Sequence, residues 1–308
     1  MRYIQSFNNS GSVQTAIDNN FLASAPSVAA DLSSNKIMWN TPKVYAAMPL
    51  TFEVQEAGDI YWGKARFATE DRTIYYKLND GEWTSIKSNR TPKKITVASG
   101  DTIQFKGDYA TYGSADGEYG EWDNVAGSFS GTTAKCKIYG NIMSLVNSTG
   151  FTNETGLTSA ATFAYLFADA NIQDAYNLVL PADKLKKGCY QAMFANNPDM
   201  HFGPLLPSTV LKGLADGLTY EEIIEWNGLD NHQNCYKELF SGCTNLAEIR
   251  CNARIITLRN IFRADVIPDW TVGVQTVDGA FYKNPDEEYW NLVQNGVPAN
   301  WTIEDLDI

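Results

Sequence analysis

Three segments in the second half of the chain share one residue pattern, and this repeat limits the fold more than any other feature. In order, each segment has a small residue, an aromatic residue, two variable residues, an aliphatic residue and a phenylalanine, at 162–167, 189–194 and 235–240. Phe167 and Phe194, which end the first two segments, are 27 residues apart. A period of roughly 20–29 residues is typical of leucine-rich-repeat solenoids, which usually act by presenting a surface. The repeat therefore favours a binding or structural protein over an enzyme.

The first two segments are followed by a second shared element, an apolar run that ends in proline at 178–181 and at 204–207. One repeat cannot bury its own apolar face, so the regular hydrophobic residues are expected to pack between stacked repeats. The residues expected in this core are Phe167, Phe194, Phe240, Leu180, Leu206 and Leu246.

The chain has five cysteines, Cys136, Cys189, Cys235, Cys243 and Cys251. Cys189 and Cys235 fill the same position of the repeat, and a buried free thiol behaves as a small hydrophobic group. We therefore expect buried thiols, with a disulfide or a metal site as the alternative. Because the chain has only 2 histidines, zinc ligands are scarce, and we expect no metal and no cofactor.

Composition and charge exclude two classes of partner. The net charge is −12, whereas nucleic-acid binding needs clustered Lys and Arg, so no nucleic-acid partner is expected. No apolar run approaches the roughly 20 residues that span a bilayer, so no membrane insertion is expected. The N-terminal residues lack the apolar core of a secretory signal, which predicts a protein that stays in the compartment where it is made.

A length of 308 residues predicts two or three units, and the expected fold is multidomain and β-rich. Residues 1–45 are polar and too few to bury a core, so this segment is expected to dock, either on the next domain or on another protein. Its candidate anchor residues are Tyr3, Ile4, Phe7, Ile17 and Phe21.

Residues 46–140 are expected to form an antiparallel β-sandwich or jelly roll, because short alternating runs are separated by turn signals. The expected strands include 50–54, 73–78 and 135–139. A hairpin is predicted at 79–82, where Asp-Gly supplies a positive φ, and a second hairpin is predicted to join 94–97 to 102–105.

Residues 141–308 are expected to form a short, irregular leucine-rich-repeat solenoid of the α/β type with a C-terminal cap. A short helix at 141–146 is expected to cap the first repeat, because an apolar stack needs closed ends. The repeats are expected to span 161–258, with an interruption at 212–233 that contains a helix at 219–226. Residues 259–308 are the expected closing cap, in which Phe281, Tyr289, Trp290 and Trp301 cover the last layer.

Several of these motifs combine into one family pattern. Cys189-Tyr190 is followed by Met193-Phe194, Gly242-Cys243-Thr244 opens a turn, and Leu-Pro precedes a leucine at 180–185 and at 206–211. The chain also has Asn-Gly-Val-Pro-Ala-Asn-Trp-Thr at 295–302. This pattern resembles the BspA-type leucine-rich repeats of Bacteroides-associated proteins, over about half of the chain.

A second resemblance covers the upstream part. The start at Tyr3-Ile4 and Ser6-Phe7, the β-rich region and the link at 138–145 resemble modular proteins of Bacteroides phages, including crAss-like phages. The resemblance implies that the N-terminal segment attaches to a virion and that the distal domain faces outward. It also implies, by analogy with fibres, a homotrimer.

The stretch 108–123 is dense in aromatic and acidic residues and is the candidate glycan site. Aromatic faces stack on sugar rings and carboxylates accept hydroxyl hydrogen bonds. The candidate residues are Tyr109, Tyr112, Asp116, Tyr119, Trp122 and Asp123. The alternatives are a loop that packs on the edge of the sandwich, and a calcium site made by Asp116, Glu118, Glu121 and Asp123.

No catalytic motif was found, and the adjacent carboxylates at 221–222 and 287–288 are expected to be solvated surface charges. We therefore expect a non-enzymatic phage virion protein, a head or tail fibre or decoration, assembled in the host cytoplasm. Its expected partners are other virion proteins through residues 1–45 and a host surface glycan. The alternatives are a bacterial cell-surface adhesin and a glycan-degrading enzyme, which would need two carboxylates in a cleft.

Overall fold

The structure of the protein, a computed structural model, describes residues 41–113, 122–207, 235–252, 279–285 and 297–307. The chain divides into two compact units, residues 1–44 and residues 45–308. The described strands are β1 (Leu50–Glu56), β2 (Gly58–Trp62), β3 (Thr73–Leu78), β4 (Thr84–Lys87), β5 (Lys93–Val97), β6 (Thr102–Lys106), β7 (Lys135–Asn141), β8 (Ile172–Val179), β9 (Phe202–Leu206), β10 (Glu248–Cys251), β11 (Ala280–Lys283) and β12 (Thr302–Asp305). The described helices are short: α2 (Thr41–Ala46) and the 3₁₀ helices η2 (Trp122–Asn124), η3 (Ile142–Leu145) and η4 (Phe151–Asn153).

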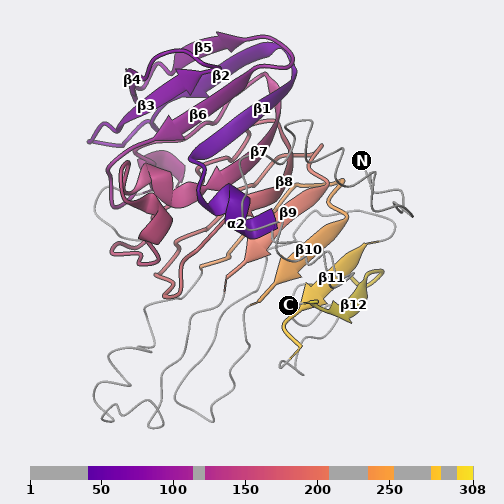
Figure 1. The fold of residues 1–308 in the computed structure, drawn as a ribbon. Helices are drawn as coiled ribbons and strands as arrows, with labels where there is room; N and C mark the ends of the chain where they lie inside the picture. Colours follow the sequence, from indigo (N-terminus) through magenta and orange to yellow (C-terminus); the bar gives the residue numbers. More distant parts are fainter. Residues whose placement is uncertain (1–40, 114–121, 208–234, 253–278, 286–296, 308) are drawn as a thin grey trace, which may run out of the picture. The chain divides into compact units, whose positions relative to one another are not determined.

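Ten of these strands form one mixed sheet in the order β12-β11-β10-β9-β8-β7-β1-β6-β3-β4 (Figure 1). In the order β7, β1, β6, β3 and β4, each strand is antiparallel to the next. From β7 to β12, each strand is parallel to the next. β2 and β5 pair in a separate two-stranded sheet. The expectation of a β-rich fold is confirmed, and the sheet is large and mixed.

The alternating patterns correctly located β1, β3 and β7, and the hairpin between β3 and β4 is confirmed. The positive φ of this turn is at Asn79 (φ 50°), not at Gly81 as the Asp-Gly pattern suggested. The Asn79 side chain explains the difference, since its Oδ1 accepts from the Thr102 amide at 2.9 Å and its Nδ2 donates to Asp101 at 2.9 Å. These bonds hold Asn79 in the left-handed region, which asparagine tolerates better than most residues.

The second predicted hairpin is wrong. β5 pairs with β2, whereas β6 pairs with β1 and β3, so the chain crosses from one sheet to the other between them. The connecting turn is attached to β1: Gly100 N donates to Val54 O at 2.8 Å, and Val54 N donates to Asp101 O at 2.9 Å. These two bonds extend the β1–β6 pairing into the turn, which leaves β5 free to pair with β2.

Three coils, at 161–169, 188–196 and 235–242, lie outside the parallel strands and are joined to one another by backbone hydrogen bonds. Alternate amides donate to the next coil, as Tyr165 N does to Gln191 O at 2.9 Å and Ala192 N does to Lys237 O at 2.8 Å. The amides between them donate within their own coil, as Leu166 N does to Phe163 O at 3.2 Å. Each coil therefore depends on its neighbour for half of its backbone hydrogen bonds.

The coils repeat a left-handed backbone conformation every four residues. Positive φ occurs at Ala161, Tyr165 and Asp169, at Gly188, Ala192 and Asn196, and at Glu238 and Gly242. Ala, Tyr and Glu rarely adopt this conformation, which costs roughly 1–2 kcal/mol per residue. The hydrogen bonds between coils compensate for the cost, and the sequence pattern alone does not reveal these positions.

Two columns of stacked aromatic rings run through the coils. Phe129, Phe167, Phe194 and Phe240 stack with successive ring centroids 5.7, 5.6 and 5.7 Å apart. Phe163, Tyr190 and Tyr236 stack at 5.9 Å in both steps. All six hydrophobic residues that the repeat placed in the core are buried, with Leu180 the most exposed at 6%. That expectation is confirmed.

The two tyrosines of the second column differ in their hydrogen bonding, and this gives a matched test. The Tyr190 hydroxyl is fully buried with no partner among the described residues, whereas the Tyr236 hydroxyl donates to Pro207 O. Tyr190→Phe is therefore expected to raise the free energy of unfolding by about 1 kcal/mol, since it removes an unsatisfied buried group. Tyr236→Phe is expected to lower it by about 1 kcal/mol. Urea unfolding of the whole chain measures both, and equal effects of the two variants would refute the assignment.

The first coil is covered by the antiparallel part of the chain. Tyr112 N donates to Thr162 O at 2.8 Å and Phe129 N donates to Leu166 O at 2.8 Å, in the pattern that joins the coils to one another. The helix expected at 141–146 exists as η3, but it lies against β1 and β6, where Ser144 Oγ donates to Phe105 O at 2.9 Å. The covering layer is therefore supplied by residues near 112 and 129, not by η3.

The parallel ladder continues beyond residue 258, where the repeats were expected to end. β11 pairs with β10 and β12 pairs with β11, so the expected closing cap supplies two further rungs. Phe281 and Trp301 are buried, as expected, whereas Tyr289 and Trp290 lie outside the described residues. The helix expected at 219–226 also lies outside them.

All five cysteines are buried thiols that form no disulfide, as expected. Burial raises the pKa of Cys136, Cys189 and Cys243 to about 12. Thiols that remain protonated at neutral pH are poor nucleophiles, so these cysteines serve packing.

Candidate binding surface

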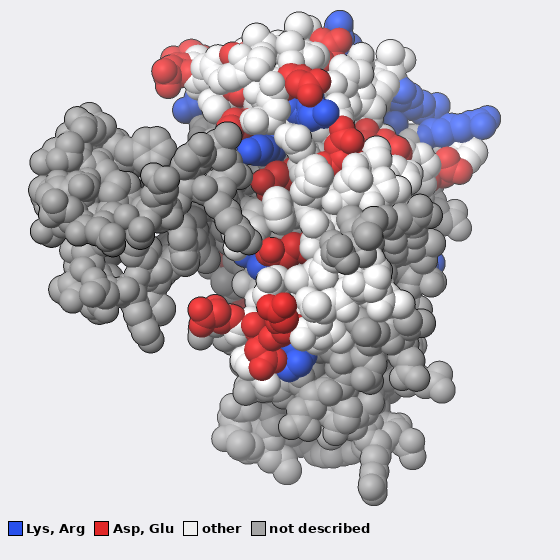
Figure 2. Space-filling view, turned by 90° about the vertical axis from the view of Figure 1, so that its right-hand side faces the viewer, with Lys and Arg blue, Asp and Glu red and all other residues white. Residues whose placement is uncertain are grey.

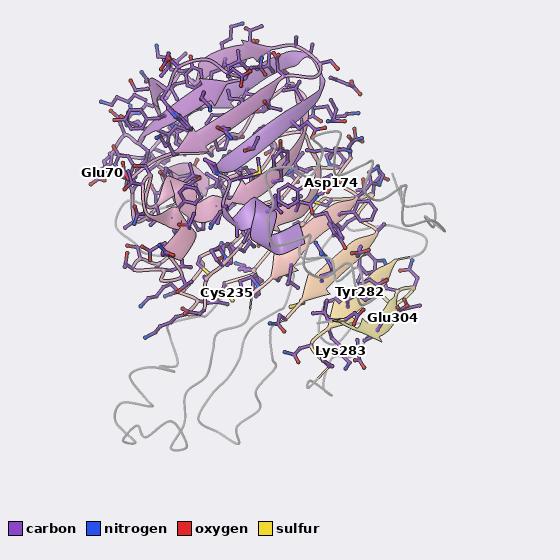
Figure 3. The ribbon with its side chains drawn as sticks, in the orientation of Figure 1. Glu70, Asp174, Cys235, Tyr282, Lys283 and Glu304 are labelled. Carbon is purple, nitrogen blue, oxygen red and sulfur yellow. The ribbon has the colours of Figure 1, made fainter. Side chains whose placement is uncertain are left out.

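The parallel strands direct aromatic and charged side chains to the outer face of the sheet, opposite the core. The strand register places Asp174 opposite Phe202 and Phe202 opposite Glu248. It also places Arg250 opposite Tyr282 and Tyr282 opposite Glu304. Figure 3 labels Asp174, Tyr282 and Glu304 along these strands. The core is made by the intervening residues, such as Ala175, Ile249 and Phe281.

Tyr176 and Arg250 are the centre of this surface. The Arg250 guanidinium carbon lies 3.4 Å from the centroid of the Tyr176 ring, and Nη2 donates to Tyr176 O at 2.6 Å and to Gly203 O at 3.4 Å. The Tyr176 ring meets the Phe202 ring edge-on at 6.2 Å, and the Tyr176 amide donates to Asp174 Oδ1 at 2.7 Å. We call Asp174, Tyr176, Phe202, Glu248 and Arg250 the Tyr176 cluster.

The charged members of the cluster are partly withdrawn from water. Arg250 Nε is 3.5 Å from Glu248 Oε1, an ion-pair distance that is longer than a hydrogen bond. Burial lowers the pKa of Arg250 and raises the pKa of Asp174. Tyr176, in contrast, is 41% exposed. The cluster therefore presents an accessible ring that its neighbours hold in a fixed orientation.

The candidate glycan loop is only partly described. Tyr112 is fully buried, and its hydroxyl donates to Leu145 O at 2.5 Å, so its ring cannot stack on a sugar. It belongs to the core, where it meets Trp62 edge-on at 5.8 Å. Tyr109 is half-buried beneath the Arg72 guanidinium, 4.9 Å from the ring centroid, and its hydroxyl accepts from Thr73 N.

Among the described candidate residues of that loop, Trp122 and Asp123 are the exposed ones. Trp122 is 39% exposed and meets Tyr165 edge-on at 5.4 Å. Asp123 O accepts from Phe67 N at 2.8 Å. Asp116 and Tyr119 lie outside the described residues, as do Glu118 and Glu121 of the calcium alternative and the anchor residues Tyr3, Ile4, Phe7, Ile17 and Phe21. Trp122 therefore remains a candidate for stacking on a sugar, whereas Tyr112 does not.

Sequence inspection missed the Tyr176 cluster, although a signal was present. Tyr176 stands two residues after Asp174 in an alternating strand, and Arg250 stands two residues after Glu248. Alternation places each pair on one face, but the contact between strands joins residues 74 positions apart. In the view of Figure 2, carboxylates are spread over the described surface, and basic groups gather mainly near its upper end.

Within the described ranges, no three His, Cys, Asp or Glu residues are grouped as a metal ion would require. None of the helices in those ranges has the length and apolar composition that crossing a bilayer needs. Models of known protein families gave no match to the chain, and neither did comparisons with curated proteins or with solved structures.

Proposed function

We propose that the chain is a non-enzymatic display protein that binds a saccharide on a bacterial surface through the Tyr176 cluster. The observation that carries the proposal is the half-exposed Tyr176 ring, held between Arg250 and Phe202 on three adjacent parallel strands. A site built on strands keeps its geometry better than one on loops. A flat aromatic face with polar groups beside it is suited to the apolar face and the hydroxyls of a sugar ring.

The charges around the ring favour a neutral sugar. Asp174 and Glu248 face Arg250, and Lys137 lies opposite Asp174 in the strand register, so acidic and basic groups are balanced around the ring. Carboxylates accept hydrogen bonds from hydroxyl groups and repel anionic ligands. A single shallow site of this kind binds weakly, and many copies on one particle would supply the avidity.

The stacked coils support a finer proposal, that residues 141–308 are a BspA-type leucine-rich-repeat solenoid. Asn197 and Cys243 each follow a left-handed residue, Asn196 and Gly242, in successive coils. Both donate to Phe194 O, at 2.8 and 3.1 Å. Asn or Cys is the residue type that the leucine-rich-repeat pattern places at such a position. For residues 46–140 the proposal is a sandwich, supported by the chain crossing between two sheets at Gly100.

The proposed setting is a phage virion, in which residues 1–45 attach to other virion proteins and a homotrimer is assembled in the host cytoplasm. The support is the sequence resemblance to modular phage proteins. Mass spectrometry of purified particles tests the setting: peptides of this chain are expected in stoichiometric amount. Their absence from particles, together with recovery of the chain from the bacterial surface, would favour the adhesin alternative.

Removing the ring at the centre of the cluster tests the binding proposal. Tyr176→Ala is expected to weaken binding of the labelled whole chain to Bacteroides cells at least tenfold, because the stacking surface is lost. Phe67→Ala is the matched control, since Phe67 is 55% exposed in a loop outside the cluster. Flow cytometry at a series of protein concentrations measures both. Binding of Tyr176→Ala at wild-type strength would refute the site.

A further inference from the structure

The antiparallel half of the sheet has a second aromatic surface, and its charge differs from that of the Tyr176 cluster. Successive side chains of β3 alternate between the two faces of the sheet. Ile74 is buried in the core, so Tyr75 and Lys77 point outward. Lys106 of β6 pairs with Tyr75. Trp83 precedes Thr84, which pairs with Tyr76, so Trp83 lies opposite Lys77 on the same face. We call Tyr75, Lys77, Trp83 and Lys106 the Trp83 platform.

Two ammonium groups converge on one indole ring in this platform. Lys106 Nζ lies 4.2 Å from the centroid of the Trp83 ring, and Lys77 Nζ lies 5.7 Å from it. Neither lysine forms an ion pair with any described residue, in contrast to Lys87 and Lys94, which pair with Asp71 and Asp59. Two like charges at one ring repel each other, and a bound anion would relieve that repulsion.

The platform is accessible to solvent, and a separate hollow lies near it. Tyr75 is 40% exposed. Beside β4, an open hollow of about 380 Å³ is lined by Lys87, Lys93 and Lys94 together with Tyr76, Ser85, Ile86 and Asn89. Tyr76 and Ile86 point to the face opposite Tyr75 and Ser85, so the hollow lies at the edge of β4 and is not part of the platform. Its Lys87 and Lys94 are already paired with Asp71 and Asp59, whereas the platform lysines have no acidic partner among the described residues, in a protein whose net charge is −12.

We propose that the Trp83 platform binds an acidic polysaccharide, with the sugar rings on Trp83 and Tyr75 and the anionic groups at Lys77 and Lys106. Charge complementarity selects this occupant, because the lysines that face the rings have no acid of their own among the described residues. The aromatic rings select a sugar polymer over a simple anion. The inference is independent of the Tyr176 cluster. That cluster is proposed to bind a neutral sugar, and a different variant, Tyr176→Ala, removes its binding.

Binding of the whole chain to polygalacturonate and to dextran sulfate tests the proposal, with unmodified dextran as the uncharged polymer. Isothermal titration calorimetry is expected to show tighter binding to a charged polymer than to dextran. The affinity is expected to fall as the salt concentration rises from 50 to 500 mM, because exposed charges are screened. The tighter of the two charged polymers identifies carboxylate or sulfate as the preferred group.

The double variant Lys77→Gln/Lys106→Gln is expected to bind at least tenfold more weakly at unchanged thermal stability. Arg66→Gln/Lys186→Gln, which changes the net charge equally outside the platform, is expected to bind as the wild type does. Trp83→Phe keeps a ring and is expected to bind within a few-fold of the wild type, whereas Trp83→Ala loses binding. Wild-type affinity of the platform double variant, equal binding of dextran, or tighter binding of a single-stranded oligonucleotide would overturn the proposal.

Discussion

Replacing Phe194 by alanine is expected to lower the free energy of unfolding by about 3–5 kcal/mol. Phe194 is fully buried in the middle of a column, with its ring 5.6 Å from Phe167 and 5.7 Å from Phe240. The alanine variant loses both stacking contacts and leaves a cavity between two coils. The coils cannot close this cavity, because hydrogen bonds such as Phe194 N to Leu239 O at 3.0 Å fix their spacing.

The loss is expected to appear as one shifted transition and not as the melting of one half alone. The apolar core is continuous, and Phe52 of β1 packs edge-on against Phe167 of the first coil at 5.9 Å. Scanning calorimetry of the variant and of the exposed-site control Phe67→Ala measures the effect, and the control is expected to change stability by less than about 0.5 kcal/mol. A Phe194→Ala variant within about 1 kcal/mol of the wild type would show that the column is not a tight core.

The sequence predicts the inside of the coils well because the core repeats one residue type at one position. Phe167, Phe194 and Phe240 end three segments with the same pattern, and the pattern is visible without knowing the path of the chain. β1 and β3 are visible for a related reason, since alternation is a local property of a strand.

What the sequence does not predict depends on pairing between distant segments. The alternation of β5 and β6 was visible, but their pairing was not, because the two hydrogen bonds of Val54 to the turn decide it. The Tyr176 cluster is hidden for the same reason. β9 and β10 are out of step by one residue between Glu248 and Arg250, so the register cannot be counted along the sequence. That shift sets which rings and charges become neighbours.

Asn197 is expected to contribute as much to stability as a large hydrophobic residue, although its side chain is polar. It is fully buried, and its Nδ2 donates to Phe167 O and to Phe194 O, both at 2.8 Å. Its Oδ1 accepts from the Ile172 amide at 2.7 Å, at the start of β8. The Asn197 side chain thus joins the first two coils to β8.

Asn197→Ala is expected to lower the free energy of unfolding by about 3 kcal/mol, because it leaves buried backbone groups without partners at about 1–3 kcal/mol each. Thr244→Ala is the matched control. Thr244 follows the third coil, and its Oγ1 makes one exposed hydrogen bond, to Pro198 O at 3.4 Å. Hydrogen exchange distinguishes the loss of the Asn197 hydrogen bonds from a general loosening of the fold. The Ile172 amide is expected to lose protection by a larger factor than amides of β1, because Asn197 is the acceptor for that amide. An equal loss of protection in both strands would assign Asn197 a packing role only.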